Sequence, residues 1–535
     1  MRLNSEAMDL IIRGGKIIDG TGAPPVQADI GIAAGKICEI GKLEAIQDVP
    51  ILDATGLTVA PGFIDIHSHS DYTLMIDPRA VSSVTQGVTL EIVGNCGHGC
   101  APIRDPATAG MNIYGYDPDR GLAWRTMAQY LDSLEKAKPA VNVASLVANG
   151  NLRLAAAGVV DRPSSATELS EMKRLLSQAL EEGGIGYSTG LEYTIERGCS
   201  EEEIQELCQM AAGAGGFYAT HTRNLYGQAR EAIEEPIRAA RRAALPVQIS
   251  HISVVARLAE QSRQAIEAAL ELVEEARTQG VDITFDMHTR MFGTTNLSAI
   301  LPAWALEGGA GEIEERLRTP SVRARMKAHP NIIYALARGD WRRIVIFDSK
   351  RQPEIARKSV AEIAEARGQD PVDTIYDILL GEIEDLHGLM VIAHAYDPDD
   401  LRCVFLHPLC MVGSDATALG IDGPLAGKCF HGAFTWAAWF YRHFVRETNL
   451  LTSEAAIHRL TGLPAGRLGL RDRGVIRKGA WADLAIFDAV QFAERGTTFE
   501  PNQVAEGMRH VLVNGVLTVE SGRLTGARAG QVLRR

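Results

Sequence analysis

The sequence has few cysteines and no excess of basic residues. Its 535 residues include 8 cysteines, which are scattered along the chain. That number is too small for a disulfide scaffold and favours a reducing compartment. Lysine and arginine together number 54, against 67 aspartates and glutamates, a formal net charge of −13. The chain therefore lacks the basic field that attracts nucleic acid or an anionic membrane, and we expect neither partner.

Long apolar runs are missing as well. Residues 1–12 hold no apolar stretch of signal-peptide length, and no run of about 18 apolar residues occurs that would span a bilayer. We therefore expect a soluble cytoplasmic protein with a small-molecule substrate, and an oligomer is compatible with this composition. Hydrophobic residues make up 46% of the chain, which is enough to build more than one domain.

Both ends of the chain show short strands and tight turns. Apolar runs bounded by turn residues occur at residues 10–13, 16–20, 30–32, 36–41, 482–488 and 510–517. Because the two ends share this pattern, we expect them to form one small β-sandwich domain. Its two parts would be residues 1–60 and residues 469–535.

Between these ends, apolar strands alternate with helical segments, as in a parallel α/β core. Eight strands are expected at residues 62–66, 88–93, 141–148, 185–188, 217–220, 247–250, 281–287 and 412–414. Helices with apolar residues every three or four positions intervene, for example at residues 166–182, 201–214 and 262–279. This order predicts an α/β fold of the (β/α)8 TIM-like barrel type within residues 61–468.

Two candidate strands are left over from the eightfold pattern. They lie at residues 344–347 and 390–393, where no barrel strand is needed. We assign both to an insertion in the barrel within about residues 289–409.

The first barrel strand carries two histidines at its carboxyl end. Residues 61–69 read PGFIDIHSH, an apolar run opened by Pro-Gly and closed by polar residues. Positions two apart on a strand project to the same face, so His67 and His69 are able to reach one metal ion together. Alone, the pattern also fits two histidines paired by chance or by structural hydrogen bonds.

Other strands end in residues of the same chemical kind. The second strand is followed by Cys96, the fifth by His221, the sixth by His251 and the last by Asp415. Barrel enzymes build their sites at the carboxyl ends of their strands. Imidazoles, a thiolate and a carboxylate that meet there suit zinc, whose tetrahedral shell accepts nitrogen, sulfur and oxygen and leaves one place for water.

Each of these residues also has a structural interpretation. Cys96 fits a small buried hydrophobe, His221 and His251 fit core histidines, and Asp415 fits a helix cap. All of these interpretations would have to hold at once, at five separate strand ends. We therefore favour the metal site.

The motifs resemble those of the N-acyl-D-amino-acid deacylases (D-aminoacylases) of the amidohydrolase superfamily, over nearly the whole chain. The segments that carry the resemblance are residues 60–69 (APGFIDIHSH), 86–89 (QGVT), 94–97 (GNCG), 218–224 (YATHTRN), 247–251 (VQISH), 412–416 (VGSDA), 468–474 (LGLRDRG) and 479–484 (GAWADL). The resemblance implies a tightly held zinc on Cys96, His221 and His251, and a weaker second metal position at His67 and His69. It also implies a catalytic carboxylate at Asp415.

The chain departs from the family pattern where the substrate carboxylate is bound. A lysine expected two residues after His251 is Ser253, and a Tyr-Pro-Tyr after the seventh strand reads His288-Thr289-Arg290. Residues 427–430 (GKCF) replace a His-Pro-Arg, and the Gly-His-Gly after the third strand contains Asn149. Because an unpaired charge is costly to desolvate, the usual recognition of a free D-amino-acid carboxylate does not transfer.

Several residues are candidates for a different substrate contact. The set comprises Tyr193, Arg223, Ser253, His288, Arg290, His394 and Asn149, to which Lys428 is added as a possible cation. Arg223 follows a proposed ligand by two residues and would also suit an orienting role. Each of them equally fits a solvated or structural side chain.

The function that these residues favour is zinc-dependent hydrolysis of an amide (N-acyl) bond. Zinc would activate water, and Asp415 would accept its proton and pass it to the departing nitrogen. An alternative keeps the metal but cleaves an ester, a lactone or a carbon–carbon bond. A further alternative is a binding protein without turnover. The presence of Asp415 and of all five candidate metal ligands in the sequence argues against it.

Overall fold

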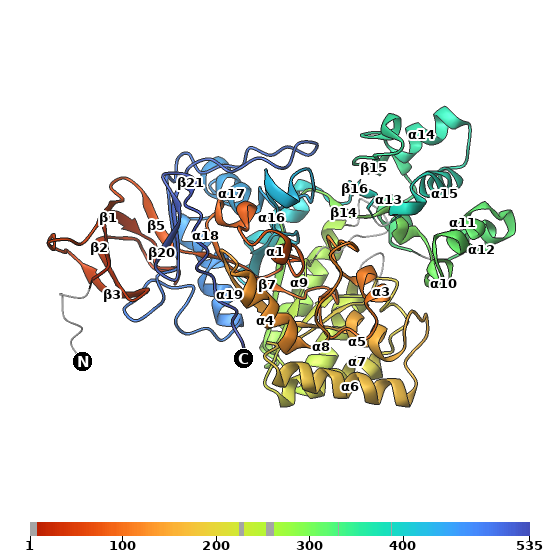
Figure 1. Cartoon of the computed structure of the whole chain (residues 1–535), viewed down its shortest axis with the longest axis horizontal. Coiled ribbons are helices and arrows are strands. Elements are labelled where there is room, and N and C mark those ends of the chain that lie inside the picture. The colour runs from red at the N-terminus through yellow and green to blue at the C-terminus, as the bar shows by residue number, and fades with distance from the viewer. Residues whose placement is uncertain (1–7, 224–228, 253–261, 330, 387) are drawn as a thin grey trace.

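The chain has a mixed α/β architecture in this computed structural model, which describes residues 8–223, 229–252, 262–329, 331–386 and 388–535 (Figure 1). Strands from the two ends of the chain share one nine-stranded sheet. Its members in spatial order are β21 (Arg523–Leu524), β20 (Val516–Glu520), β19 (Met508–Val513), β18 (Leu484–Phe487), β5 (Thr58–Pro61), β1 (Leu10–Ile17), β2 (Val26–Ala33) and β3 (Lys36–Gly41), with β4 (Ile51–Asp53) paired to β1. The junction of the two ends is the antiparallel pair β18–β5.

A single strand replaces the first predicted turn. The expected break at Gly14 and Gly15 is wrong, because β1 runs through both residues and pairs with β2 on either side of them. The register shifts between Ile12 and Gly15 instead, which is a β-bulge, and Gly14 takes a φ of +70° there. Glycine tolerates that backbone without a Cβ penalty.

The predicted parallel strands are confirmed and lie in two sheets. One contains β6 (Phe63–Asp65), β7 (Val88–Val93) and β8 (Asn142–Ser145); the other contains β9 (Val147–Ala148), β10 (Tyr187–Gly190), β11 (Tyr218–His221), β12 (Val247–Ile249), β13 (Ile283–His288) and β17 (Cys410–Gly413). The third predicted strand is split into β8 and β9 around Leu146. Past the first and last strands, Ser68 and Ala416 form an isolated parallel bridge.

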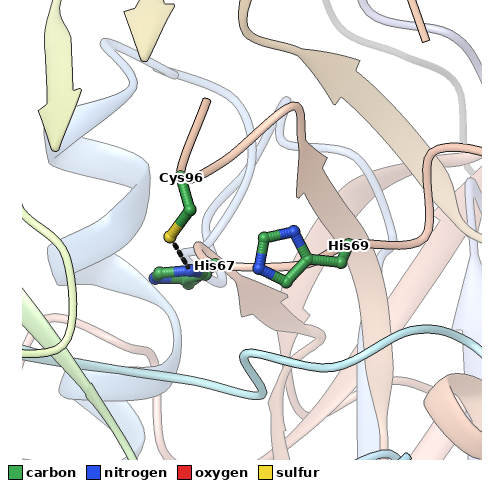
Figure 2. Close-up of side chains that lie close together, drawn as sticks. All are labelled: His67, His69 and Cys96. Carbon is green, nitrogen blue, oxygen red and sulfur yellow. Dashed lines mark hydrogen bonds between the residues drawn. The ribbon is translucent and has the colours of Figure 1, made fainter. Parts of the chain in front are cut away.

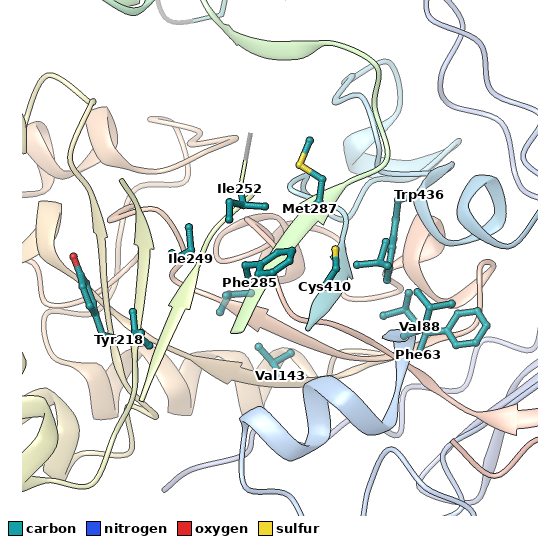
Figure 3. Packing of buried hydrophobic residues seen from close by; sticks show 14 of the residues in the cluster. Phe63, Val88, Val143, Tyr218, Ile249, Ile252, Phe285, Met287, Cys410 and Trp436 are labelled. Atoms are coloured by element: carbon teal, nitrogen blue, oxygen red, sulfur yellow. The ribbon is translucent and has the colours of Figure 1, made fainter. Parts of the chain in front are cut away.

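Successive residues of these strands face two different apolar clusters. One cluster includes Ile64, Ile66, Leu90, Ile92 and Ala219. The neighbouring strand positions belong to the largest core, among them Phe63, Val88, Val143, Tyr218 and Phe285 (Figure 3). Burial on both faces explains why the strands read as continuous apolar runs.

The helices follow the strands. Three correspond to the predicted ones, namely α6 (Ala166–Glu181), α7 (Glu201–Gly213) and α9 (Ser262–Thr278). The others around the parallel strands are α1 (Thr73–Ile76), α2 (Val81–Val84), α3 (Pro106–Ala109), α4 (Met127–Ala137), α5 (Asn149–Ala156), α8 (Ala229–Ala243), α16 (Pro398–Leu406), α17 (Trp436–Tyr441), α18 (Ser453–Leu460) and α19 (Gly462–Arg467). Ser165 and Ser200 cap α6 and α7 through hydrogen bonds to the backbone N–H of Glu168 and Glu203.

The segment between β13 and β17 has a hydrophobic core of its own, built from residues 297–395. It contains the antiparallel sheet β14 (Gly293–Asn296), β16 (Met390–Ala393) and β15 (Ile344–Ile346), with helices α10 (Ala303–Leu306), α11 (Ala310–Arg318), α12 (Pro320–Lys327), α13 (Ile332–Ala337), α14 (Val360–Arg367) and α15 (Pro371–Gly381). The two surplus strands are thus confirmed as β15 and β16, whereas β14 was not expected. Figure 1 shows this segment at the opposite end of the molecule from β1–β3.

No helix within the described ranges combines the length and the apolar character that a membrane crossing requires.

Glu203→Gln is expected to lower the free energy of unfolding by about 3–5 kcal/mol. The fully buried Arg153 of α5 pairs through Nη1 with Glu203 Oε1 of α7 at 2.7 Å. Glutamine keeps the shape of the side chain but leaves the guanidinium charge buried without a counter-ion. Urea unfolding followed by circular dichroism measures the loss. The control is Glu201→Gln, whose partly exposed pair with Arg238 is expected to contribute less than about 1 kcal/mol; equal losses would contradict the prediction.

Candidate metal centre

The parallel strands bring five potential metal ligands to one edge. His67 and His69 follow β6, Cys96 follows β7, His221 is the last residue of β11, and His251 follows β12. All five side chains are buried, with at most 6% of any residue exposed. Figure 2 shows the Cys96 thiol pointing at the His67 ring, with His69 beside it.

The donor atoms of Cys96, His221 and His251 lie close to one another. Cys96 Sγ is 3.5 Å from His251 Nε2, and His251 Nε2 is 3.0 Å from His221 Nδ1. A tetrahedral zinc with bonds of about 2.0–2.3 Å would separate its ligand atoms by about 3.3–3.8 Å. The 3.5 Å separation lies within this range and the 3.0 Å separation just below it. One thiol and two imidazoles are ligands that suit zinc.

A second group of donors shares atoms with the first. His67 Nε2 is 3.1 Å from Cys96 Sγ and 3.5 Å from Asp415 Oδ1, and His69 Nε2 is 3.2 Å from the same carboxylate oxygen. His67, His69 and Cys96 form one possible metal-holding group, and His67, His251 and Asp415 form another. Asp415 therefore reaches the cluster from β17.

Three of these residues have a left-handed backbone conformation. The φ angles are +52° at Cys96, +30° at His251 and +45° at Asp415. Non-glycine residues in sparsely populated regions of this kind cost of order 1–3 kcal/mol each and persist where the surroundings impose them. Here the Asp415 N–H donates to the His67 carbonyl at 2.8 Å, which ties the first and last parallel strands together at the site.

Asp286 joins the site without having been predicted. It lies on β13, is buried, and its Oδ1 accepts from the His251 N–H at 2.8 Å and lies 2.9 Å from His67 Nδ1. Oδ2 accepts from Gln248 Nε2 at 2.5 Å. The signal in the sequence was a carboxylate near the carboxyl end of the apolar strand 281–287, which also contains Asp282. Asp286 fixes the His67 ring so that its Nε2 atom faces the cluster.

Glu192 plays the same part for another histidine. Its Oε2 lies 3.1 Å from His221 Nε2, on the side of the ring away from His251. A carboxylate in that position favours the proton on Nε2 and leaves Nδ1 free as a donor to a metal.

Burial keeps the rings of His221 and His251 neutral. It lowers the pKa of His221 and the pKa of His251 to about 3, which leaves both as the neutral imidazoles that bind metal. Burial also raises the pKa of the Cys96 thiol to about 11. A dication at the site would supply the positive charge that a thiolate needs.

Asp415 is held ionised by its neighbours. Burial raises the pKa of this carboxyl group, but the Arg290 guanidinium and a hydrogen bond with His69 lower it by a larger amount. The pKa therefore lies well below its ordinary value. Arg290 Nη2 is 2.5 Å from Asp415 Oδ2. The carboxylate is therefore ionised at neutral pH, which is the protonation state that a proton acceptor requires.

Aromatic rings form a continuous wall beside the cluster. From His69 the wall runs to Tyr114 (ring centroids 4.7 Å apart), to His98 (4.8 Å), to Tyr193 (4.5 Å) and to His221 (4.7 Å). Burial lowers the pKa of His98 to about 3, so the wall carries no charge at neutral pH. Sequence reasoning missed His98 and Tyr114, because neither lies at the end of a strand.

The remaining predicted site residues have mixed surroundings. Tyr193 belongs to the aromatic wall, and the buried Asn149 donates to Glu196 Oε2 at 2.8 Å. Arg223 is engaged by Glu235 at 3.1 Å and by the carbonyls of Arg197 and Cys199. The structure thus brings Tyr193 to the cluster, whereas the contacts of Asn149 and Arg223 are structural.

Three further candidates follow β13 or belong to the segment after it. The buried ring of His288 is 6.3 Å from that of His251 and 5.5 Å from that of Tyr396. His394 is exposed, with its ring 6.2 Å from that of Phe292. Arg290 reaches Asp415, as described above, and Ser253 lies outside the described residues.

Asp286→Asn is expected to weaken zinc binding by about 10- to 100-fold, the usual effect of removing a carboxylate that orients a ligand. The variant loses the charge that holds His67 and the His251 backbone in place. Competition with a chelating dye measures the affinity. Asp282→Asn, at an exposed carboxylate that pairs with Arg467, is the control, and equal affinities in both variants would contradict the assignment.

Comparison with known proteins places this chain in a family. The model of the amidohydrolase family matches residues 51–331 and 349–519. The N-acyl-D-glutamate deacylase of Alcaligenes xylosoxydans xylosoxydans is 34% identical over 532 residues, which cover 99% of this chain and 97% of that protein.

Solved structures agree over the same length. A D-aminoacylase, studied for the functional role of its binuclear metal centre, superposes with a TM-score of 0.81 at 30% identity, covering 99% of this chain and 100% of that one. The N-acyl-D-glutamate deacylase of Bordetella bronchiseptica, complexed with zinc and a phosphonate mimic of the tetrahedral intermediate, gives 0.80 at 31% identity with the same coverage. This chain therefore belongs to the amidohydrolase family of enzymes, and within it to the N-acyl-D-amino-acid deacylase group that its sequence resembles.

Proposed function

We propose that this protein is a zinc-dependent amidohydrolase that cleaves the N-acyl amide bond of a small molecule. The observation that carries the proposal is the grouping of Cys96, His221 and His251, whose donor atoms all lie within 4.8 Å of one another, with the Asp415 carboxylate 3.2 Å from His69. The zinc in the related deacylase from Bordetella bronchiseptica supports the choice of metal.

The tight zinc position is assigned to Cys96, His221 and His251, and a weaker second position to His67 and His69. Bound there, zinc would supply a water with a pKa near about 7 in place of about 15.7, and would polarise the substrate carbonyl. The related D-aminoacylase, described as activated by one metal and attenuated by a second, supports this division.

Asp415 carries the proton in this proposal. Its Oδ1 faces His67 and His69, on the side where water and substrate would meet. The carboxylate takes the proton of the attacking water and gives it to the departing nitrogen, which would otherwise leave as a strongly basic amide anion. Asp286 and Glu192 keep the rings of His67 and His221 oriented throughout.

Recognition of the acid half of the substrate is proposed to differ from that in the named relatives. The aromatic wall of His69, Tyr114, His98 and Tyr193 is uncharged at neutral pH. Burial and the nearby Arg290 also hold the pKa of His288 well below its ordinary value, which keeps this ring neutral. These surroundings suit a substrate whose acid half is neutral, bulky or aromatic.

We propose that the two parallel sheets are one (β/α)8 barrel, supported by the Ser68–Ala416 bridge between the first and last strands. The catalytic barrel would span residues 61–468 and contain the insertion within residues 289–409. Residues 1–60 and 469–535 would form the small β domain, supported by the shared nine-stranded sheet. The free thiols of all 8 cysteines support a cytoplasmic location.

The proposal is tested with a substrate panel and the zinc-loaded protein. The panel contains N-acetyl-D-phenylalanine, its L enantiomer, its carboxamide, N-acetyl-D-glutamate, a phenyl ester and a lactone. We expect the wild-type protein to release primary amine from at least one amide. The rate of this release should exceed the rate at which the Asp415→Asn variant cleaves the ester. Turnover confined to the ester or lactone would assign the metal site to another reaction.

A further inference from the structure

Arg290 has an unusual position for a candidate substrate contact. It follows β13 by two residues, at the point where the chain leaves the parallel strands, and it is 6% exposed. Its guanidinium group lies against two other segments, the loop after β17 and the loop at His431. The side chain therefore joins three segments that are distant in the sequence.

These segments engage both terminal nitrogens of the Arg290 guanidinium group. Nη1 donates to the carbonyls of Ser414 at 2.8 Å, Asp415 at 3.0 Å and His431 at 2.6 Å, and Nη2 donates to Asp415 Oδ2 at 2.5 Å. Gly432 permits this approach, because a Cβ there would lie 2.6 Å from Nη1. Nε is buried and has no hydrogen-bond partner among the described residues. Because four acceptors already engage the two terminal nitrogens, little of the guanidinium fork is left for a substrate carboxylate.

The two oxygens of the Asp415 carboxylate face different partners. Oδ1 lies toward His69 and His67, whereas Oδ2 lies toward Arg290. Since one oxygen is held by the guanidinium group, the rotation of the carboxylate is set so that the other faces the metal ligands. The same guanidinium group binds the Asp415 carbonyl, which steadies the residue at its positive φ of 45°.

We propose that Arg290 is a positioning residue for Asp415, and that it does not serve as the counter-ion of a substrate carboxylate. The inference rests on the proposed amidohydrolase function and concerns this same site. An arginine suits the role because its planar fork binds a carboxylate and several carbonyls at fixed angles, which the single ammonium of a lysine does not do.

The test compares Arg290→Gln and Arg290→Lys with wild type on an acid and its carboxamide, using the fastest such pair of the panel. Arg290→Gln is expected to lower kcat by about 100-fold for both substrates alike, the size of effect that a misplaced catalytic group produces. KM and the zinc content should stay within about threefold of wild type, because neither substrate nor metal ligand is removed. Arg290→Lys should recover part of kcat, since its ammonium still pairs with Oδ2.

Arg459→Gln is the matched control. Arg459 is also buried and donates to the carbonyls of Ala455, Leu406 and His407. Its loss should lower stability but leave kcat per folded chain unchanged. If Arg290→Gln fails to fold, the test is the kcat of Arg290→Lys, which should be lower than that of wild type for both substrates.

Two kinetic results would overturn the inference. One is a KM that rises for the acid but not for the carboxamide while kcat stays constant, which would make Arg290 the partner of the substrate carboxylate. The other is kinetics equal to wild type in both Arg290 variants. If the wild-type protein releases no amine from any amide, both the proposed function and this inference are wrong. That result is seen with the wild-type protein alone, before any variant is made.

Discussion

Asp415→Asn should lower kcat for amide hydrolysis by about 10²- to 10⁴-fold, the range that a positioned acid–base group contributes. Asparagine keeps the size of the side chain and the hydrogen bond with Arg290, but its amide cannot take up the proton of the attacking water. Cys96, His221 and His251 are unchanged, so about one zinc per chain should remain. Steady-state amine release and elemental analysis measure the two quantities.

The control for this variant is Asp422→Asn. Asp422 lies in the same loop region, is largely exposed and pairs with Arg79, so its replacement should leave kcat unchanged. If Asp415→Asn kept full activity, the base would have to be another group. If it lost zinc as well as activity, Asp415 would instead be needed to hold the metal.

Cys96→Ala should lose the metal itself. The thiol is the only sulfur in the groups of possible ligands among the described residues, and its Sγ lies within 3.5 Å of both His67 Nε2 and His251 Nε2. Without it two imidazoles remain at the tight position, which is fewer than the three protein ligands of a catalytic zinc. Zinc after dialysis should fall to below about 0.1 per chain, and activity should fall at least tenfold, to about that fraction of wild type.

Cys100→Ala provides a matched control because Cys100 is another buried free thiol, four residues further along the chain. It belongs to none of the groups of possible metal ligands in the described part of the chain. Its replacement should leave zinc content and kcat near wild type. Equal zinc in the Cys96→Ala and Cys100→Ala proteins would remove Cys96 from the metal site.

The parallel strands and the grouping of the candidate metal ligands were predictable for one physical reason. In a parallel sheet the carboxyl ends of the strands meet at one edge, so residues that follow successive apolar runs become neighbours in space. His67, Cys96, His221 and His251 are all of this kind, and no knowledge of the loops was needed to group them.

Residues outside that rule were not predictable. Asp286 lies within its strand, and its role depends on which neighbouring residues its side chain meets. His98 and Tyr114 come from an irregular segment whose path the local sequence does not determine. Arg290 appeared to be a free cation from the sequence, whereas its two terminal nitrogens bind the loops at Ser414, Asp415 and His431. Such contacts arise from tertiary packing and not from periodicity.

Small features of the backbone were also beyond the sequence pattern. Gly14 and Gly15 suggested a turn, but pairing with β2 on both sides is retained through a bulge. β14 was missed because its sequence, Gly293–Asn296, lacks an apolar run and the strand is held by pairing with β16. In both cases the partner strand decides the conformation.

A zinc titration of chelator-treated wild-type protein, followed by the rate of amine release from the best amide of the panel, decides whether the reaction depends on zinc at this site. We expect no activity without metal and a rise to full activity as the first equivalent of zinc is bound, with no activity in Cys96→Ala at that concentration. Full activity in protein shown to be free of metal would contradict this expectation.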